Sequence, residues 1–416
     1  MKGILIGLVF GAFLYEGANA KKIETEQAIF QKSDKRDNSL VNSTELVMTA
    51  DVLRDLQLKG KEFKKLKKLE IEGVVGNDYV LLYQLSLLLS KSKNLEELHF
   101  VECELTELPE NIKALKNLKV LHIRYNRLTE LPEFIGDLKC LKELNVEWNQ
   151  LSTIPESIGN LTQLNMLNLQ GNLIESLPES IGNLSNLIEL DVGDNIRLES
   201  LPESIGNLQK LEKLWVYGNH LNLLPTSIGN LKNLKTLAVQ NNSLTAIPEN
   251  IGNLENLKVL SLGYTRITSL PESIGKLKNL EHLYLESLEL KSLPDSLGNL
   301  QSLTHLDLDG GEIGNSLTII PDCICDLSSL RHLALGYNKL ISIPENMKRL
   351  ENLTRLDISY NPSLKKWPKA LERLRNLREL QIDTNQESEW AQSIKKLKKI
   401  NKNLRINAVR LGWREK

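Results

Sequence analysis

A motif of about 23 residues recurs through most of this 416-residue chain and constrains its fold more than any other feature. Its clearest copy runs from Leu164 to Leu184. With Leu164 counted as position 1, apolar residues stand at positions 1, 4, 6, 11, 14, 18 and 21, Asn stands at position 9 and Pro at position 15. A fixed period in this range is typical of a solenoid, in which each repeat packs mainly against its two neighbours.

Thirteen copies of the motif follow one another with little change in length. They begin at Leu95, Leu118, Leu141, Leu164, Leu187, Leu211, Leu234, Leu257, Leu280, Leu303, Leu330, Leu353 and Leu377. The step is 23 residues, except for 24 after Leu187, 27 after Leu303 and 24 after Leu353. The length alone would suggest two or three globular domains, but a solenoid grows by adding repeats, so the array favours one continuous fold.

The pattern within a repeat predicts its local structure. Positions 3 to 7 are expected to form a short strand, with positions 4 and 6 pointing inward and positions 3, 5 and 7 pointing outward, because strand side chains alternate. Stacked repeats then form a parallel sheet. Pro at position 15 fixes φ and ends strand pairing, which favours a short turn or 3₁₀ segment in the second half of the repeat.

Asn at position 9 is expected to form a ladder, since its amide can donate to and accept from the backbone of adjacent turns. The ladder comprises Asn126, Asn149, Asn172, Asn195, Asn219, Asn242, Asn338, Asn361 and Asn385. Three consecutive copies lack it and carry Thr265, Leu288 and Gly311 instead, the last beside an insertion over residues 310–318. Such departures indicate either a functional site or drift in a tolerant array.

The wording Leu-Pro-Glu-x-Ile-Gly-Asn-Leu resembles the leucine-rich repeat family of the 23-residue, Leu-Pro type, and most of all secreted bacterial members such as those of spirochaetes. The resemblance covers about three quarters of the chain. It implies an α/β solenoid of horseshoe form, with a parallel sheet on the concave face and short turns or 3₁₀ segments on the convex face. It also implies that the partner is a protein, of the class of host surface or matrix proteins.

The amino-terminal segments are expected to be a signal peptide at residues 1–20 and a leader with a cap at residues 21–94. Lys2 precedes an apolar run at residues 3–15 that is too short to span a bilayer, and Ala18-Asn19-Ala20 supplies the small residues of a cleavage site. These features predict export to the periplasm, the cell surface or the outside. Within the cap we expect strands at residues 53–58 and 66–71 and a helix over residues 79–90.

The repeats occupy residues 95–385, and a carboxy-terminal cap at residues 386–416 completes the expected domains. The cap is predicted to hold a helix with a basic face over residues 387–400. No segment after the signal peptide has the length and apolarity of a membrane span. The cap is also too short for a separate catalytic domain.

The charge balance and the cysteines exclude some functions. The 52 Lys and Arg residues against 53 Asp and Glu residues leave a net charge of −1, and the repeats hold no long basic run, so nucleic acid and anionic membranes are not expected partners. Cys103 replaces Asn at position 9 and is expected to be a buried thiol. Cys323 and Cys325 lack the two-residue spacing of zinc and redox motifs. The sequence does not decide whether they form a disulfide with each other.

No catalytic motif is present. The chain holds no Gly-rich phosphate loop, no Gly-x-Ser-x-Gly elbow and no His-Glu-x-x-His, so we expect no enzyme activity. The outward positions 3, 5, 7 and 8 hold eight of the chain's 14 Trp and Tyr residues, namely Tyr125, Trp148, Trp215, Tyr217, Tyr264, Tyr284, Tyr337 and Tyr360. Exposed aromatic residues with a polar end are enriched in binding surfaces.

The sequence therefore predicts a partner-binding surface on the concave face. Its expected members are Trp148, Trp215, Tyr217, Tyr264 and Tyr284, flanked by the acidic Glu143, Glu147 and Asp191. Aromatic residues at position 8, at the end of the strand, could instead pack against neighbouring turns. On this argument the sequence favours Trp215, Tyr217 and Tyr284 as the most available anchors.

A second hypothesis is a zinc site, the one cofactor that the sequence suggests. His282, His305 and His332 occupy position 3 of consecutive copies, and adjacent strands bring like positions about 4.8 Å apart. Two of these imidazoles together with a carboxylate, Asp307 or Asp309, could coordinate one ion. The competing interpretation is an ordinary polar stripe produced by repeat duplication.

Overall fold

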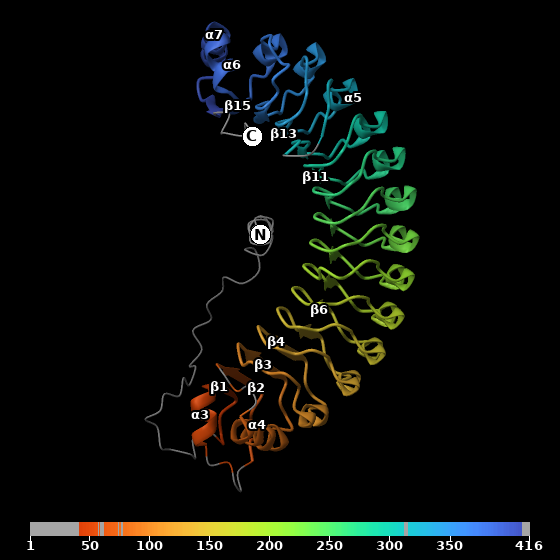
Figure 1. Cartoon of the computed structure of the whole chain (residues 1–416), viewed down its shortest axis with the longest axis vertical. Helices are drawn as coiled ribbons and strands as arrows, with labels where there is room; N and C mark the ends of the chain where they lie inside the picture. The colour runs from red at the N-terminus through yellow and green to blue at the C-terminus, as the bar shows by residue number, and fades with distance from the viewer. Residues whose placement is uncertain are drawn as a thin grey trace. The chain divides into compact units, whose positions relative to one another are not determined.

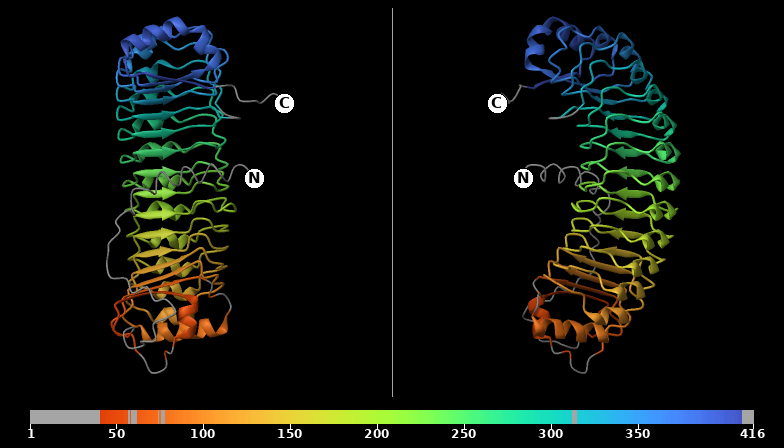
Figure 2. Two further views of the ribbon diagram at one scale, coloured as in Figure 1. Left: turned by 90° about the vertical axis from the view of Figure 1, so that its left-hand side faces the viewer. Right: turned by 45° about the vertical axis from the view of Figure 1, so that its right-hand side comes forward.

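The computed structural model describes residues 41–56, 58, 62–73, 75, 78–311 and 315–409. The predicted signal peptide at residues 1–20 and residues 21–40 of the leader lie outside the described residues. The chain divides into two compact units, Met1–Leu173 and Ile174–Lys416. Each unit is a stack of repeats with strands on one side and short helices on the other (Figures 1 and 2).

The first unit carries six strands that pair in parallel, each with the next along the chain, over the part for which pairing is described. They are β1 (Glu45–Thr49), β2 (Lys68–Glu72), β3 (Glu97–Val101), β4 (Val120–Arg124), β5 (Glu143–Asn145) and β6 (Met166–Asn168). Its helices are α3 (Ala50–Asp55), α4 (Tyr79–Lys91), η1 (Glu110–Ala114), η2 (Glu133–Asp137) and η3 (Glu156–Asn160), where η denotes a 3₁₀ helix.

The second unit continues the same pattern with ten described strands in chain order. They are β7 (Glu189–Asp191), β8 (Lys213–Trp215), β9 (Thr236–Ala238), β10 (Val259–Ser261), β11 (His282–Tyr284), β12 (His305–Asp307), β13 (His332–Ala334), β14 (Arg355–Asp357), β15 (Glu379–Asp383) and β16 (Arg405–Val409). Within this unit the strands line the inner side of a curved stack and the short helices its outer side (Figure 1).

The short helices of the second unit begin directly after the proline of each repeat. They are η4 (Glu179–Asn183), η5 (Glu203–Asn207), η6 (Thr226–Asn230), η7 (Glu249–Asn253), η8 (Glu272–Lys276), η9 (Asp295–Asn299), α5 (Asp322–Cys325), η10 (Glu345–Arg349) and η11 (Lys369–Arg373), followed by α6 (Thr384–Glu389) and α7 (Ala391–Ile400). The predicted fold class, a solenoid with a parallel sheet and 3₁₀ turns, is confirmed. The strands are shorter than predicted, because most cover only positions 3 to 5.

The apolar positions of the motif form the core, as predicted. In the repeat that begins at Leu211, all seven apolar side chains are buried and none is more than 5% exposed, namely Leu211, Leu214, Val216, Leu221, Leu224, Ile228 and Leu231. Burial of an aliphatic side chain contributes about 1.5–3 kcal/mol relative to exposure, so this aliphatic stripe is the main stabilising element of each repeat.

The asparagine ladder works as expected in most repeats. The Nδ2 of Asn219 donates to the carbonyl oxygens of Val192 and Val216, and its Oδ1 accepts from the N–H of Asn195. The amide thus pairs buried backbone groups that would otherwise lack partners. Cys103, the buried thiol that the sequence predicts, donates from Sγ to the carbonyl of Ile71.

The ladder prediction is wrong at two places. Gly311 does not end the ladder, because Asn315 beyond the insertion accepts from the N–H of Leu290 and donates to the carbonyl of Leu285. Asn385 is exposed on α6 and is no ladder residue. The turn there begins with a capping box between Asp383 and Gln386.

Two predicted elements at the ends also differ. The strand predicted at residues 53–58 is wrong where the structure describes it, because Glu45–Thr49 forms the first strand and residues 50–55 form α3. The carboxy-terminal helix is split at Trp390 into α6 and α7, and β16 follows it. The helix over residues 79–90 is confirmed as α4. All four cysteines are free, so Cys323 and Cys325 are separate buried thiols on α5.

Candidate functional site

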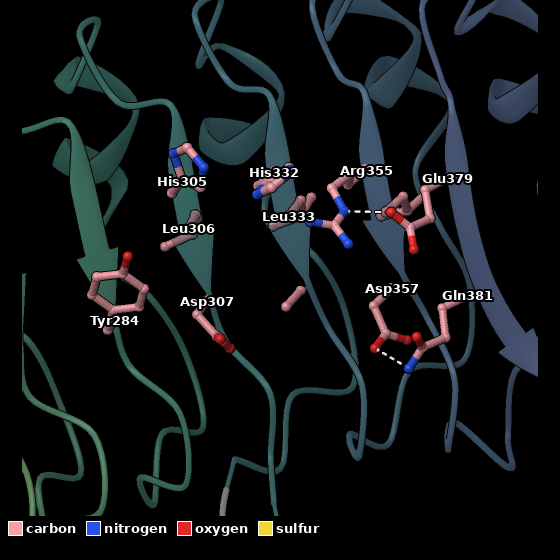
Figure 3. A pocket seen from close by; sticks show the side chains of 12 residues that line it. Tyr284, His305, Leu306, Asp307, His332, Leu333, Arg355, Asp357, Glu379 and Gln381 are labelled. Atoms are coloured by element: carbon pink, nitrogen blue, oxygen red, sulfur yellow. Dashed lines mark hydrogen bonds and ion pairs between the residues drawn. The ribbon is translucent and has the colours of Figure 1, made fainter. Parts of the chain in front are cut away.

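A hollow of about 230 Å³ opens on the strand face of the second unit, over β11 to β15 (Figure 3). Ala334 lies at its floor between the in-register neighbours Asp307 and Asp357. Because alanine is small where its neighbours carry longer side chains, the face is recessed here. Its walls are Tyr284, His305, His332, Arg355, Glu379 and Gln381 together with these two aspartates.

The three histidines of the predicted column do stack on adjacent strands. His282 pairs with His305 and His305 with His332, and their ring centroids are 4.3 and 4.4 Å apart. Burial is the main cause that lowers the pKa of each, and it brings the pKa of His305 to about 4. The imidazoles are therefore neutral near pH 7.

The predicted zinc ligands lie side by side but do not form a metal-binding arrangement. Among the described residues, no group of three or more His, Cys, Asp or Glu side chains is arranged to hold a metal ion. Asp307 is instead engaged with its own loop, because its Oδ1 accepts from the N–H of Asp309 at 2.9 Å. The geometry thus gives no support to the zinc hypothesis for His282, His305, His332 and Asp307.

Asp307 and Asp357 line the hollow, and a third aspartate, Asp309, lies beside it. The Oδ1 of Asp309 accepts from the N–H of Gly311 at 2.7 Å. The Oδ1 of Asp357 accepts from the N–H of Ser359, and its Oδ2 accepts from Nε2 of Gln381 at 2.7 Å (Figure 3). These bonds fix the carboxylates over the sheet, because each aspartate is tied to a backbone group two residues ahead.

Burial raises the pKa of these carboxyl groups. The pKa of Asp307 rises to about 6, mainly through burial and secondarily through repulsion from Asp309 and Asp357. Burial likewise raises the pKa of Asp309 and of Asp357. Glu286, beyond the hollow, has its pKa raised to about 7 by burial. Burial thus disfavours the charged form of Asp307, Asp309 and Asp357, and the negative charge of these carboxylates is poorly solvated.

The predicted aromatic anchors are exposed in the opposite order from that expected. Trp148 and Tyr264 at position 8 are 39% and 40% exposed, whereas Trp215, Tyr217 and Tyr284 are half-buried on the sheet. Position 8 adopts a left-handed backbone, with φ of 53° at Trp148 and 54° at Tyr264. This conformation turns the side chain out at the strand end, and it is costly for a bulky residue.

Two aromatic pairs form along position 8, each inside one unit. Tyr125 and Trp148 stack in the first unit with centroids 6.4 Å apart and planes at 4°. Tyr337 and Tyr360 stack in the second unit, with centroids 4.0 Å apart. The second pair follows the strands at the floor of the hollow, β13 and β14.

The predicted acidic flank is largely engaged within the protein. Glu147 accepts at Oε2 from Nδ2 of Asn168 and lies 3.7 Å from Nη1 of Arg124. Glu143 lies 3.7 Å from Nε2 of His122. Asp191 is only 6% exposed and accepts from the N–H of Gly193. These three residues thus shape the sheet face more than they offer free charge.

The predicted site residues also fall in different units. Trp148, Glu143 and Glu147 belong to the first unit, and Trp215, Tyr217, Tyr264, Tyr284 and Asp191 belong to the second. Of these partner-binding residues only Tyr284 lines the hollow, together with His305, His332 and Asp307 of the predicted zinc site. Sequence reasoning missed Arg355, Asp357, Glu379 and Gln381. They stand at the same positions 3 and 5 as the residues it selected, so a survey of charged as well as aromatic outward residues would have found them.

Comparison with known proteins identifies the family. The model described as leucine-rich repeat region matches residues 141–224 and 218–320, and the leucine rich repeat model matches residues 93–151. A leucine-rich repeat protein from Leptospira interrogans is 30% identical, with a TM-score of 0.73 over 92% of this chain and 100% of that one. The chain belongs to the leucine-rich repeat family.

Other leucine-rich repeat structures are more distant. The plant peptide hormone receptor RGFR1, solved in complex with RGF2, is 25% identical with a TM-score of 0.63, over 88% of this chain and 62% of that one. An internalin from Listeria monocytogenes is 22% identical with a TM-score of 0.61, over 74% and 84%, and shares the fold. A comparison with curated protein sequences gives no match. None of the helices in the described ranges is both long and apolar enough to cross a bilayer.

Proposed function

We propose that this leucine-rich repeat protein is an exported, non-catalytic scaffold that binds a protein partner through the strand face of its second unit. The observation that carries the proposal is the hollow over β11 to β15, whose lining holds Tyr284, Arg355 and Glu379 around a small floor residue, Ala334. A recessed centre with aromatic and arginine side chains and a polar rim is the usual composition of a protein interface.

The comparisons support the class of activity. RGFR1 is a plant peptide hormone receptor, solved in complex with RGF2, which makes a protein or peptide ligand a natural expectation for a related fold. The likeness to a spirochaete protein and the predicted signal peptide favour an extracellular partner, such as a host surface or matrix protein. No observation in the described residues favours zinc as a second function.

Pull-down of extracellular proteins with the full chain, followed by titration of each captured partner against variants, tests the proposal. Tyr284→Ala and Arg355→Ala should each weaken binding about tenfold or more, since aromatic and arginine anchors dominate interface energies. Matched controls are Tyr79→Ala on α4, where the tyrosine is 87% exposed, and Arg331→Ala, whose side chain is exposed beside β13. If the controls weaken binding as much as the face variants, the strand face is not the binding surface.

Export is a separate part of the proposal with its own test. Amino-terminal sequencing of the protein recovered from its native cells should begin at or near Lys21, because Ala18 and Ala20 are the small residues of the expected cleavage site. A cytoplasmic product that retains Met1 would contradict export. That outcome would leave the binding face in place but remove extracellular proteins as the partner class.

A further inference from the structure

Two outward positions on β13 and the loop that follows it carry small residues, and carboxylates from the neighbouring repeats lie beside them. Ala334 lies between Asp307 and Asp357 in register. A β-carbon built on Gly336, two residues further, would lie 2.6 Å from Oδ2 of Asp309 and 3.4 Å from Oδ2 of Asp357. The carboxylate of Asp309 thus lies directly against Gly336, and the carboxylates of Asp307 and Asp357 stand on either side of Ala334.

These carboxylates lack a cation. In the part of the chain that the structure describes, no Lys or Arg forms an ion pair with Asp307, Asp309 or Asp357. Arg355 is the one arginine that lines the hollow, and it pairs through Nε with Glu379 instead (Figure 3). His305 and His332 are neutral near pH 7. With Asp307, Asp357 and Glu379 against Arg355, the lining carries an excess of two negative charges, and Asp309 beside it adds a third.

The hydrogen bonds leave acceptor capacity beside the hollow. Asp307 and Asp309 each use Oδ1 for a backbone N–H of their own loop. Oδ2 of Asp309, the oxygen not used in that bond, lies against Gly336 at the edge of the hollow. Uncompensated carboxylates in a poorly solvated place are unfavourable, and a cation that enters with its own hydrogen-bond donors relieves that cost.

Aromatic rings stand at the edges of the hollow. Tyr284 lies beside Asp307 on the adjacent strand (Figure 3). The stacked pair Tyr337 and Tyr360 follows the strands at the other side of Gly336. Planar guanidinium groups bind carboxylates through paired hydrogen bonds and stack on aromatic faces, which a compact ammonium does less well. The volume, about 230 Å³, is below the ~300–1,000 Å³ usual for small-molecule pockets and suits one long side chain.

We propose that the hollow receives an arginine side chain of the protein partner, with its guanidinium between Asp307, Asp309 and Asp357 and its stem along Tyr284. The inference rests on the proposed function and specifies which partner residue the face recognises. A metal ion is a poor occupant, because the described residues offer no set of three ligands. An anion is excluded by the charge of the lining.

A small probe tests the site without knowledge of the partner. The peptide acetyl-Gly-Arg-Gly-amide is titrated into the full chain at pH 7.5 and observed by saturation-transfer difference NMR. The matched probe replaces arginine with citrulline, which has nearly the same shape and no charge, and a third probe carries lysine. We expect transfer to the arginine side-chain protons, weaker transfer to lysine and none above background to citrulline.

Two double variants complete the test. Asp307→Asn/Asp309→Asn keeps an acceptor oxygen for the loop N–H groups, so it should fold and bind the arginine peptide at least about tenfold more weakly. The control Asp295→Asn/Glu289→Gln removes two exposed charges outside the hollow and should change nothing. Equal transfer to citrulline, or an unchanged signal in the first variant, would overturn the inference.

The probe and partner experiments distinguish failure of the arginine site from failure of the proposed function. If the peptide binds but captured partners ignore Tyr284→Ala and Arg355→Ala, the arginine site stands and the proposed function fails. The opposite outcome is that Tyr284→Ala and Arg355→Ala weaken partner binding, while Asp307→Asn/Asp309→Asn changes the binding of neither the arginine peptide nor the partners. In that case the face binds proteins without an arginine anchor.

Discussion

The side-chain amide of Asn315 donates from Nδ2 to the carbonyl oxygen of Leu285, 2.8 Å away, and thereby carries the asparagine ladder across the longest insertion of the array. The same side chain accepts from the N–H of Leu290. Asn315→Ala should therefore leave buried backbone groups unpaired. We expect a loss of about 2 kcal/mol or more in the free energy of unfolding, measured by urea titration.

Asn385→Ala is the matched control for this substitution. Asn385 stands at ladder position 9 by count, but it is exposed on α6. Its replacement should change the free energy of unfolding by less than about 0.5 kcal/mol. Similar losses in both variants would contradict the assignment of the ladder to Asn315.

The 3₁₀ turns depend on glycine for close packing rather than for backbone freedom. A β-carbon on Gly275 would lie 2.4 Å from the carbonyl oxygen of Ser296 in the next turn. Gly275→Ala should therefore force the two turns apart and lower stability by about 1–3 kcal/mol, the usual range for overpacking. Thermal unfolding followed by circular dichroism measures this, with the exposed Ser292→Ala of the following repeat as a control.

Trp148 lies on Gly171, and this contact gives an optical test in the first unit. A β-carbon on Gly171 would lie 2.8 Å from Cδ2 of the indole, and Gly171 has a φ of 67°. Gly171→Ala should displace the indole and cost about 1 kcal/mol for the left-handed backbone. We expect a shift in tryptophan fluorescence that is missing when Trp148 is first replaced by Phe. An unchanged emission spectrum would show that the indole does not rest on this glycine.

Much of the fold followed from the periodic sequence. Strand alternation predicts the buried stripe of the Leu211 repeat. Because every repeat follows the same backbone path, the motif also predicts the register of the histidines on β11 to β13. The role of glycine in the Ser-Ile-Gly motif could not be read from a single repeat, because Gly275 packs closely against Ser296 of the next repeat.

The candidate site was harder to predict, because depth on a sheet face depends on the size of neighbours. The outward positions were correct for Asp307 and Tyr284, but the hollow arises from Ala334 and Gly336, which attract no notice as single residues. The left-handed backbone at Trp148 and Tyr264 likewise has no sequence signal when the residue is aromatic, since glycine and asparagine are the usual markers. That backbone reversed the expected order of exposure.

The raised pKa of Asp307 predicts a stability cost that depends on pH. Its pKa is 3.8 for a solvated carboxyl and rises to about 6 in the folded protein, first through burial. Below about pH 4 the group is protonated in both the folded and unfolded states, and it costs nothing. As the pH rises from 4 to 6 only the unfolded state loses the proton, and above 6 the folded protein bears the full penalty of the charge.

Asp307→Asn should therefore stabilise the protein at neutral pH. The amide keeps an oxygen for the N–H of Asp309 and removes the charge, so we expect the melting temperature at pH 7.5 to rise by about 2 °C or more, and the gain to vanish near pH 4. Calorimetry at both pH values measures this, with Asp295→Asn as the exposed control. Because the same variant belongs to the pair that should lose the arginine peptide, higher stability with weaker binding would mark these carboxylates as retained for recognition. A lower melting temperature at pH 7.5 would show instead that the carboxylate of Asp307 stabilises the loop after β12.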